Sequence, residues 1–202
     1  MSIFSLSGKT VLVTGASSGF GHHFAGVLGR AGARVVLGAR RVDKIQARVD
    51  ELSAAGHEVL GLPLDVRDVD SAKNFLTGAV EAFGGIDVLI NNAGVEAGAK
   101  TYTMIDDEDW DYVFDTNLKA AWRLSKFYTQ WVAEQGGTGS IVNIASITAY
   151  RTIKGRFPYA VSKAALVKAT EIMALEGARY GVRVNALAPG YILTDVSRVL
   201  LE

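Results

Sequence analysis

The chain has 202 residues, of which 49% are hydrophobic and 21% charged. This composition is typical of one globular domain and excludes a disordered, collagenous or coiled-coil chain. The 21 basic and 21 acidic residues give a net charge of zero. The chain as a whole therefore has no excess positive charge that would attract nucleic acid or an anionic membrane, although a local basic patch remains possible.

Cysteine is absent, which excludes a disulfide framework, a thiol nucleophile and a thiolate metal site and leaves the redox compartment open. The N-terminus is too short and too polar before Lys9 for a secretory signal, and no apolar run approaches the roughly 18 residues of a membrane span. We therefore expect a cytoplasmic protein with no membrane or nucleic-acid partner.

Apolar runs rich in Val, Ile and Leu alternate with amphipathic stretches along the whole chain. The runs are too continuous for strands with one wet face, so they predict buried parallel strands at 10–14, 34–39, 58–64, 86–91, 140–145 and 183–188. Helices are predicted at 19–30, 41–55, 69–83, 107–135 and 158–180. The alternation predicts the α/β class, a doubly wound parallel sheet or Rossmann fold, as a single domain over residues 1–202.

A glycine loop joins the first predicted strand to the first predicted helix. Gly15, Gly19 and Gly21 give the spacing GxxxGxG. Such a turn lets the backbone approach a pyrophosphate, while the helix N-terminus offers free N–H groups. Because the spacing departs from the common GxGxxG fingerprint, a tight turn without a ligand remains an alternative.

The end of the second predicted strand bears on the choice of cofactor. An acidic residue at this place binds the ribose of NAD, but here the strand ends in Ala39, Arg40 and Arg41. Two guanidiniums suit a 2′-phosphate, so NADP(H) is predicted rather than NAD(H). Alternatively, one or both arginines merely begin the next helix in solvent.

Three side chains are candidates for catalysis. Ser146 follows the fifth predicted strand, at the sheet edge where ligands bind. Tyr159 and Lys163 are four residues apart on one helical face, so the cation is expected to lower the pKa of the phenol below about 10 and let it exchange a proton. Taken alone, a Tyr-x-x-x-Lys pair is more often structural than catalytic.

Together these motifs resemble the short-chain dehydrogenase/reductase family almost from end to end. They occur in order as TGASSGFG at 14–21, Asp65-Val66, Asn91-Asn92-Ala93-Gly94, Asn117, Ser146, Tyr159 to Lys163, and Pro189-Gly190. The segment PGYILTD also resembles the 3-oxoacyl carrier-protein reductases within the family.

The resemblance implies a role for each matching residue. Tyr159 would exchange the proton, Ser146 would hold the substrate oxygen, Lys163 would bind the nicotinamide ribose and Asn117 would support a relay water. Cofactor contacts are implied for Gly15, Ser17, Ser18, Gly19, Phe20, Gly21, Arg40, Arg41, Asp65, Val66, Asn91, Ala93, Gly94, Tyr159, Lys163, Pro189, Gly190, Ile192 and Thr194.

The resemblance also bears on the C-terminus and on assembly. Family members usually continue with lid helices and a last strand, whereas this sequence stops at Glu202, so we expect either a truncated chain or an omitted tail. In the family the helices at 107–135 and 158–180 pair across subunits, which implies a homodimer or homotetramer.

Several other polar and aromatic residues are candidates for binding or packing. His22, His23 and His57 lack the spacing of a metal site, so no metal is expected. Trp110, Trp122 and Trp131 suit core or subunit packing, and the acidic residues at 106–109 suit a helix N-terminus. Three cations at Arg151, Lys154 and Arg156 border the expected pocket; they would receive an anionic substrate or are simply solvated.

The sequence thus predicts an NADP(H)-dependent oxidoreductase that interconverts a ketone and a secondary alcohol, with Tyr159 as the general acid/base. The alternative is a catalytically silent dinucleotide-binding protein that acts through its bound cofactor state or its surface.

Overall fold

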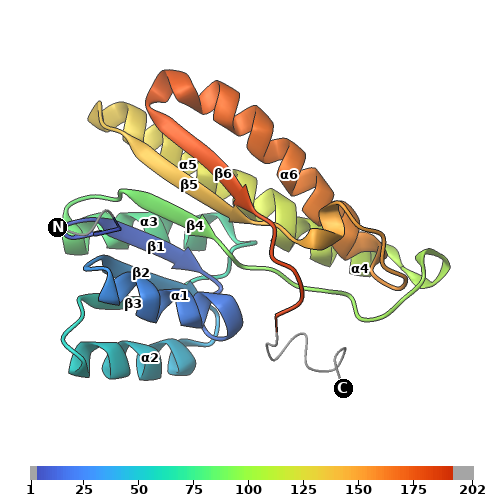
Figure 1. Cartoon of the computed structure of the whole chain (residues 1–202), viewed down its shortest axis with the longest axis horizontal. Coiled ribbons are helices and arrows are strands. Elements are labelled where there is room, and N and C mark those ends of the chain that lie inside the picture. The colour runs from blue at the N-terminus through green and yellow to red at the C-terminus, as the bar shows by residue number, and fades with distance from the viewer. Residues whose placement is uncertain (1–3, 193–202) are drawn as a thin grey trace. The chain divides into compact units, whose positions relative to one another are not determined.

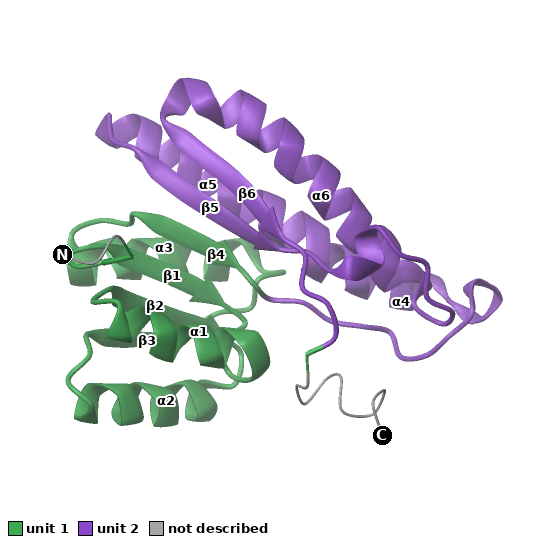
Figure 2. Ribbon diagram, in the orientation of Figure 1, with its two compact units in different colours: residues 1–92, 192–202 green, residues 93–191 purple. Residues whose placement is uncertain are grey.

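A computed structural model describes residues 4–192. Its contacts divide the chain into two compact units, which Figure 2 shows in different colours. Unit 1 comprises residues 1–92 and 192–202, and unit 2 comprises residues 93–191. The single domain expected from the sequence stays a prediction.

Unit 1 alternates strands and helices as predicted. Its elements are β1 (Thr10–Thr14), α1 (Gly19–Arg30), β2 (Arg34–Ala39), α2 (Val42–Ala54), β3 (Val59–Pro63), α3 (Val69–Phe83) and β4 (Val88–Asn91). The strands lie in the order β3-β2-β1-β4, and each pairs in parallel with its neighbours. In Figure 1, α1 and α2 cover one face of this sheet and α3 covers the other.

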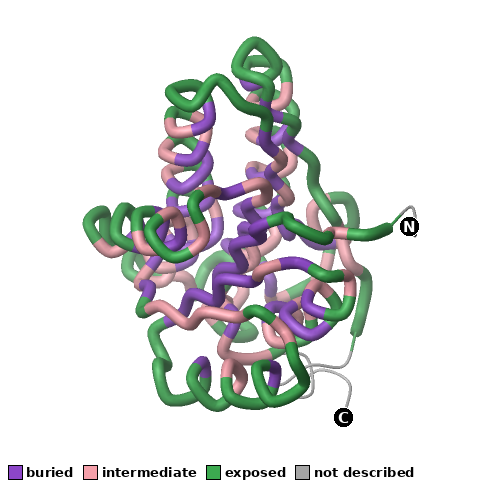
Figure 3. Tube along the Cα trace, turned by 90° about the vertical axis from the view of Figure 1, so that its left-hand side faces the viewer, coloured by how far each residue is buried: buried purple, intermediate pink, exposed green. Residues whose placement is uncertain are grey.

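The helices of unit 1 pack closely because glycines in the strands leave room for them. A Cβ at Gly38 would lie 2.7 Å from the ring of Phe75 in α3, and one at Gly61 would lie 2.6 Å from Ile45 in α2. Every residue of β1 is buried. Figure 3 shows buried positions along the strands and exposed ones on the outer turns of the helices.

Unit 2 supplies a second parallel pair with its own helices. Its strands and main helices are α4 (Asp107–Phe114), α5 (Ala120–Gln135), β5 (Gly139–Ile144), α6 (Phe157–Gly177) and β6 (Val182–Leu187). Its short helical turns are η1 (Tyr102–Met104), η2 (Asp115–Lys119), η3 (Ile147–Ala149) and η4 (Ala178–Tyr180). Strands β5 and β6 pair in parallel from Gly139 opposite Val182 to Ile144 opposite Leu187.

The structure confirms the α/β class with parallel strands, and most predicted element bounds agree within one or two residues. The predicted helix at 107–135 is interrupted by the π-helical turn η2. Asp106 caps α4 by accepting a hydrogen bond from the backbone N–H of Asp109, which is the dipole role expected of this acidic run.

Within residues 4–192, no helix is both long enough and apolar enough to cross a bilayer. The same residues hold no group of three His, Cys, Asp or Glu side chains arranged to bind a metal ion.

Candidate active site

The glycine loop of unit 1 has a backbone that only glycine adopts readily. Gly15, directly after β1, has φ of 66°, and Gly19, the first residue of α1, has φ of 57°. Both angles lie in the left-handed region, where a side chain is strained. The two glycines therefore shape the turn that leads from the buried strand into the helix.

Gly21 is required for a different reason, which is close packing. A Cβ there would lie 2.6 Å from the carbonyl oxygen of Gly15 and 2.7 Å from the side-chain nitrogen of Asn92. Asn92 Nδ2 donates to the carbonyls of Thr14, at 2.8 Å, and Gly15, at 3.2 Å. Asn92 thus fastens the loop, a function that the sequence analysis missed although the residue stands in the Asn-Asn-Ala-Gly motif.

Arg41 reaches the same loop from the start of α2. Its guanidinium donates to Ser17 Oγ at 2.9 Å and to Ser18 Oγ at 2.8 Å. Ser18 occupies the N-cap position of α1, but its hydroxyl accepts from Arg41 rather than from a helix N–H. The first turn of α1 therefore keeps N–H groups for an anion, beside a guanidinium cation.

The other cofactor candidates of unit 1 lie at strand ends or on exposed turns. Arg40 is exposed at the end of β2, and Phe20 stacks on Phe24 in α1. Asp65 follows β3, and its carboxylate accepts from the backbone N–H of Arg67 at 3.0 Å. Val66 and Asn91 are buried.

The candidates near the ends of unit 2 are backbone segments. Ala93 and Gly94 follow β4, whereas Pro189 and Gly190 follow β6. The Pro189 carbonyl accepts from the N–H of Ile147 at 2.9 Å, which holds this segment beside the turn that carries Ser146. Ile192 is exposed, and Thr194 lies outside the described residues.

Ser146 and Tyr159 both belong to unit 2, and hydrogen bonding with Ser146 acts to lower the pKa of the Tyr159 phenol. Ser146 precedes η3 and is buried, and its Oγ also accepts from the N–H of Thr148 at 3.2 Å. Tyr159 is in the first turn of α6, behind Pro158, where proline fits because its missing N–H would have no helical partner.

Lys163 lies on the same face of α6, fully buried. Its Nζ is 5.7 Å from the centre of the Tyr159 ring and donates to the carbonyl oxygen of Ile144 at 2.7 Å. Because a buried ammonium is poorly solvated, the pKa of Lys163 falls to about 8. The amine keeps donor capacity beyond this one carbonyl, which fits it to hold ribose hydroxyls.

The expected effect of Lys163 on Tyr159 is wrong for the protein without cofactor. The pKa of Tyr159 lies above its ordinary value because burial penalises the phenolate most strongly. The hydrogen bond from Ser146 and the charge of Arg156 oppose this rise, and they are weaker. Arg156, which the sequence analysis linked to an anionic substrate, thus also bears on the phenol.

Asn117 lies in the π-helical turn η2 and is almost fully buried. Its Oδ1 accepts from the N–H of Val95 at 2.8 Å, and its Nδ2 donates to the carbonyl of Val95 and to Ser162 Oγ. Ser162 in turn donates to the Tyr159 carbonyl at 2.8 Å. Asn117 is therefore connected to the first turn of α6 through Ser162, and π turns are frequent at functional sites.

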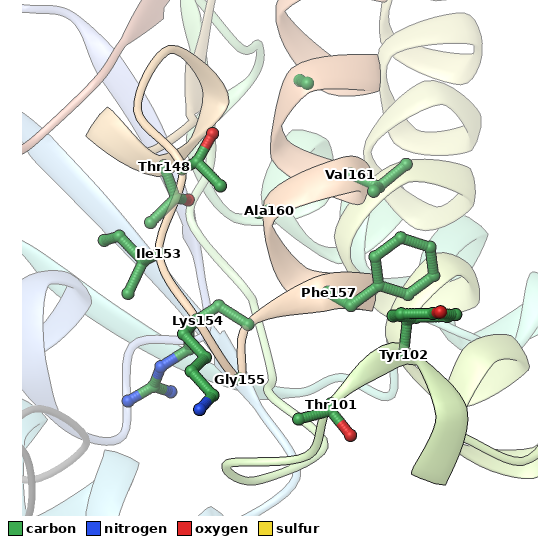
Figure 4. A pocket seen from close by; sticks show the side chains of 12 residues that line it. Thr101, Tyr102, Thr148, Ile153, Lys154, Gly155, Phe157, Ala160 and Val161 are labelled. Atoms are coloured by element: carbon green, nitrogen blue, oxygen red, sulfur yellow. The ribbon is translucent and has the colours of Figure 1, made fainter.

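A cavity of about 580 Å³ lies beside the first turns of α6. Figure 4 shows Tyr102 and Phe157 next to each other on one side and Ile153 and Lys154 on the other. Of the three loop cations, Lys154 and Arg151 are exposed, whereas Arg156 is buried and paired with Glu96. An anion could meet Lys154 here, whereas the guanidinium of Arg156 is already engaged by Glu96.

The chain is similar to known proteins over nearly its whole length. A family model described as short chain dehydrogenase matches residues 9–202. Dehydrogenase/reductase SDR family member 4 of Bos taurus is 39% identical over 197 residues, which is 98% of this chain and 70% of that relative.

Two solved structures agree with this assignment. A short-chain type dehydrogenase/reductase from Mycobacterium marinum superposes with a TM-score of 0.94 at 33% identity, covering 98% of this chain and 79% of the other. An actinorhodin polyketide ketoreductase solved with NADPH has a TM-score of 0.90 at 38% identity, covering 95% and 74%. The resemblance drawn from the motifs is thereby confirmed, and this chain belongs to the short-chain dehydrogenase family of NAD(P)-dependent oxidoreductases that act on CH–OH groups.

Proposed function

We propose that the protein is an NADP(H)-dependent oxidoreductase that interconverts a ketone and a secondary alcohol, with Tyr159 as the group that exchanges the proton. The observation that carries this proposal is the arrangement at the start of α6. Hydrogen bonding with Ser146 acts on the phenol of Tyr159, and the buried amine of Lys163 lies 5.7 Å from the centre of its ring. A hydroxyl pair beside a buried cation can bind and protonate a carbonyl oxygen.

Each of these side chains has one task in the proposed reaction. Ser146 donates a hydrogen bond to the substrate oxygen, and Tyr159 gives its proton to that oxygen in reduction or removes it in oxidation. Lys163 holds ribose hydroxyls, and Asn117 keeps the first turn of α6 in place through Ser162. NADP(H), when bound, supplies or accepts the hydride at its nicotinamide ring.

The preference for NADP(H) is supported by Arg41 and by the residues around it. Its guanidinium is held by the hydroxyls of Ser17 and Ser18, so a cation is already in place beside the N-terminus of α1. Positions 38–40 carry no carboxylate that would favour the ribose of NAD. Arg40 is exposed and available as a second phosphate ligand. The remaining cofactor contacts, from Asp65 to Ile192, stay proposals by resemblance.

The nature of the substrate beyond a ketone or alcohol also stays a prediction. Since Arg156 is paired with Glu96, the case for an anionic substrate depends on Lys154 and Arg151 alone. The expected homodimer or homotetramer and the cytoplasmic localisation stay predictions too.

The test is oxidation of NADPH by the full chain with a broad panel of ketones, comparing Tyr159→Phe with Tyr150→Phe. We expect the first change to lower turnover at least about a hundredfold, the usual contribution of a positioned general acid/base, with cofactor affinity retained. Tyr150 is exposed between η3 and α6, so its substitution should leave turnover unchanged. Tight NADPH binding without turnover on any ketone would favour the silent binding protein instead.

A further inference from the structure

The segment at 95–100 in unit 2 is fastened to its surroundings at several points. The side chain of Asn117 bonds both the N–H and the carbonyl of Val95. Glu96 forms an ion pair with Arg156, and Lys100 forms one with Asp109. An isolated parallel bridge joins the backbones of Lys100 and Arg156. Two of these contacts therefore converge on Arg156, the residue before α6.

Arg156 begins the helix that carries Tyr159. It occupies the N-cap position of α6, and its carbonyl accepts the N–H of Ala160 at 2.8 Å. Only 8% of its side chain is exposed, and the Glu96 side chain is 19% exposed. Taking such a pair out of water is costly, so it adds little stability by itself. We therefore explain the ion pair by what it does at the start of α6. It fixes the position of Arg156 and keeps the guanidinium charge at the N-cap.

Tyr159 lies three residues after Arg156, about one helical turn away. The described groups that act on its hydroxyl and ring are Ser146 from the preceding turn, Lys163 from its own helix and Arg156 from the helix start. Lys163 donates to the carbonyl of Ile144, and the charge of Arg156, the smallest of the effects on the Tyr159 pKa, favours the phenolate. Glu96 in turn holds Arg156.

We propose that Arg156, held by Glu96, is a positioning residue for Tyr159, fixing the first turn of α6 and keeping a guanidinium cation one turn before the phenol. This inference rests on the proposed function, because it concerns the residue that exchanges the proton there. The 95–100 segment is then the support that keeps the guanidinium buried at the helix start.

The main test variant is Glu96→Gln/Arg156→Gln, which removes both charges without leaving either one buried alone. The control is Lys100→Met/Asp109→Asn, which removes the other ion pair of the same segment. For alcohol oxidation we expect the first variant to shift the pH profile to higher pH and to lower kcat at about pH 8 roughly tenfold, with a smaller change in KM. The control and Arg156→Lys, which retains the cation, should keep the wild-type profile.

A second measurement separates this inference from the proposed function. Tyrosinate absorbance, titrated in each protein and compared with the same protein carrying Tyr159→Phe, follows the ionisation of Tyr159 without turnover. A higher pKa in Glu96→Gln/Arg156→Gln would support the inference even in a chain that turned over no ketone. An unchanged tyrosinate titration and pH profile in the folded double variant would overturn it and leave the proposed reaction intact.

Discussion

The candidate cofactor loop of unit 1 is shaped by backbone, whereas the candidate catalytic group of unit 2 consists of side chains in buried polar contacts. In unit 1 the decisive features are two left-handed glycines and the space that Gly21 leaves beside Gly15. In unit 2 they are a buried amine, a hydroxyl pair and a buried ion pair. The first region should therefore respond most to added atoms, and the second most to changes of charge.

The largest effect is expected where an atom is added to the glycine loop of unit 1. In Gly21→Ala the new Cβ would lie 2.6 Å from the Gly15 carbonyl and 2.9 Å from Ala16 Cα. Because neither is the end of a flexible side chain, we expect a loss of about 3 kcal/mol in the free energy of unfolding and weaker NADPH binding. Urea unfolding and a cofactor titration would measure both.

The control for this variant is Gly137→Ala, where an added Cβ has nothing within 4 Å. The idea that the close contacts of the added Cβ decide the effect would fail if both substitutions behaved alike.

The next largest effect is the pH dependence of the folded protein's stability, which buried Lys163 in unit 2 should cause. The pKa of Lys163 is about 8 in the folded protein, below its ordinary value of 10.5. The unfolded chain therefore binds more protons between these two values, so the stability of the folded protein rises with pH in that window. From about pH 7.5 to about pH 9.5 the wild type should gain about 2 kcal/mol relative to Lys163→Met. Parallel stability curves for the two proteins would show that the amine is not buried as described.

The smallest effect concerns Arg41, a charged side chain that contacts the glycine loop of unit 1. Removing the guanidinium in Arg41→Ala should weaken NADP binding about tenfold, the scale of one charge-assisted hydrogen bond, and leave NAD binding nearly unchanged. Arg40→Ala is the matched variant, since Arg40 is exposed and adjacent. A larger loss in Arg40→Ala than in Arg41→Ala would reverse the roles given to the two arginines.

The elements of the fold could be predicted because the sequence alternates continuous apolar runs with amphipathic ones. β1 and β2, at 10–14 and 34–39, were predicted with their observed bounds. The turn η2 could not be predicted, because a π turn changes the helix period by a single residue and leaves the apolar pattern nearly intact.

The site was predictable where a motif fixes both residue type and place, as for Gly15, Ser146 and Tyr159. Contacts that depend on tertiary structure were not. Nothing in the local sequence shows that Glu96 would meet Arg156 sixty positions later. For the same reason the pKa of Tyr159 was predicted in the wrong direction, because burial cannot be judged from the spacing of a tyrosine and a lysine.

The π turn at Asp115–Lys119 also limits how this protein can be shortened. A π turn holds one residue more than an α turn, so deleting a single residue here, such as exposed Lys119, would let the chain wind as an uninterrupted α-helix. That more regular helix would keep α4 and α5 in phase, because only the extra residue is removed, but it would tighten the turn that carries Asn117 and disturb its hydrogen bonds to Val95. A deletion at this point should therefore spare the fold and harm the candidate site, even though the residue removed is on the surface.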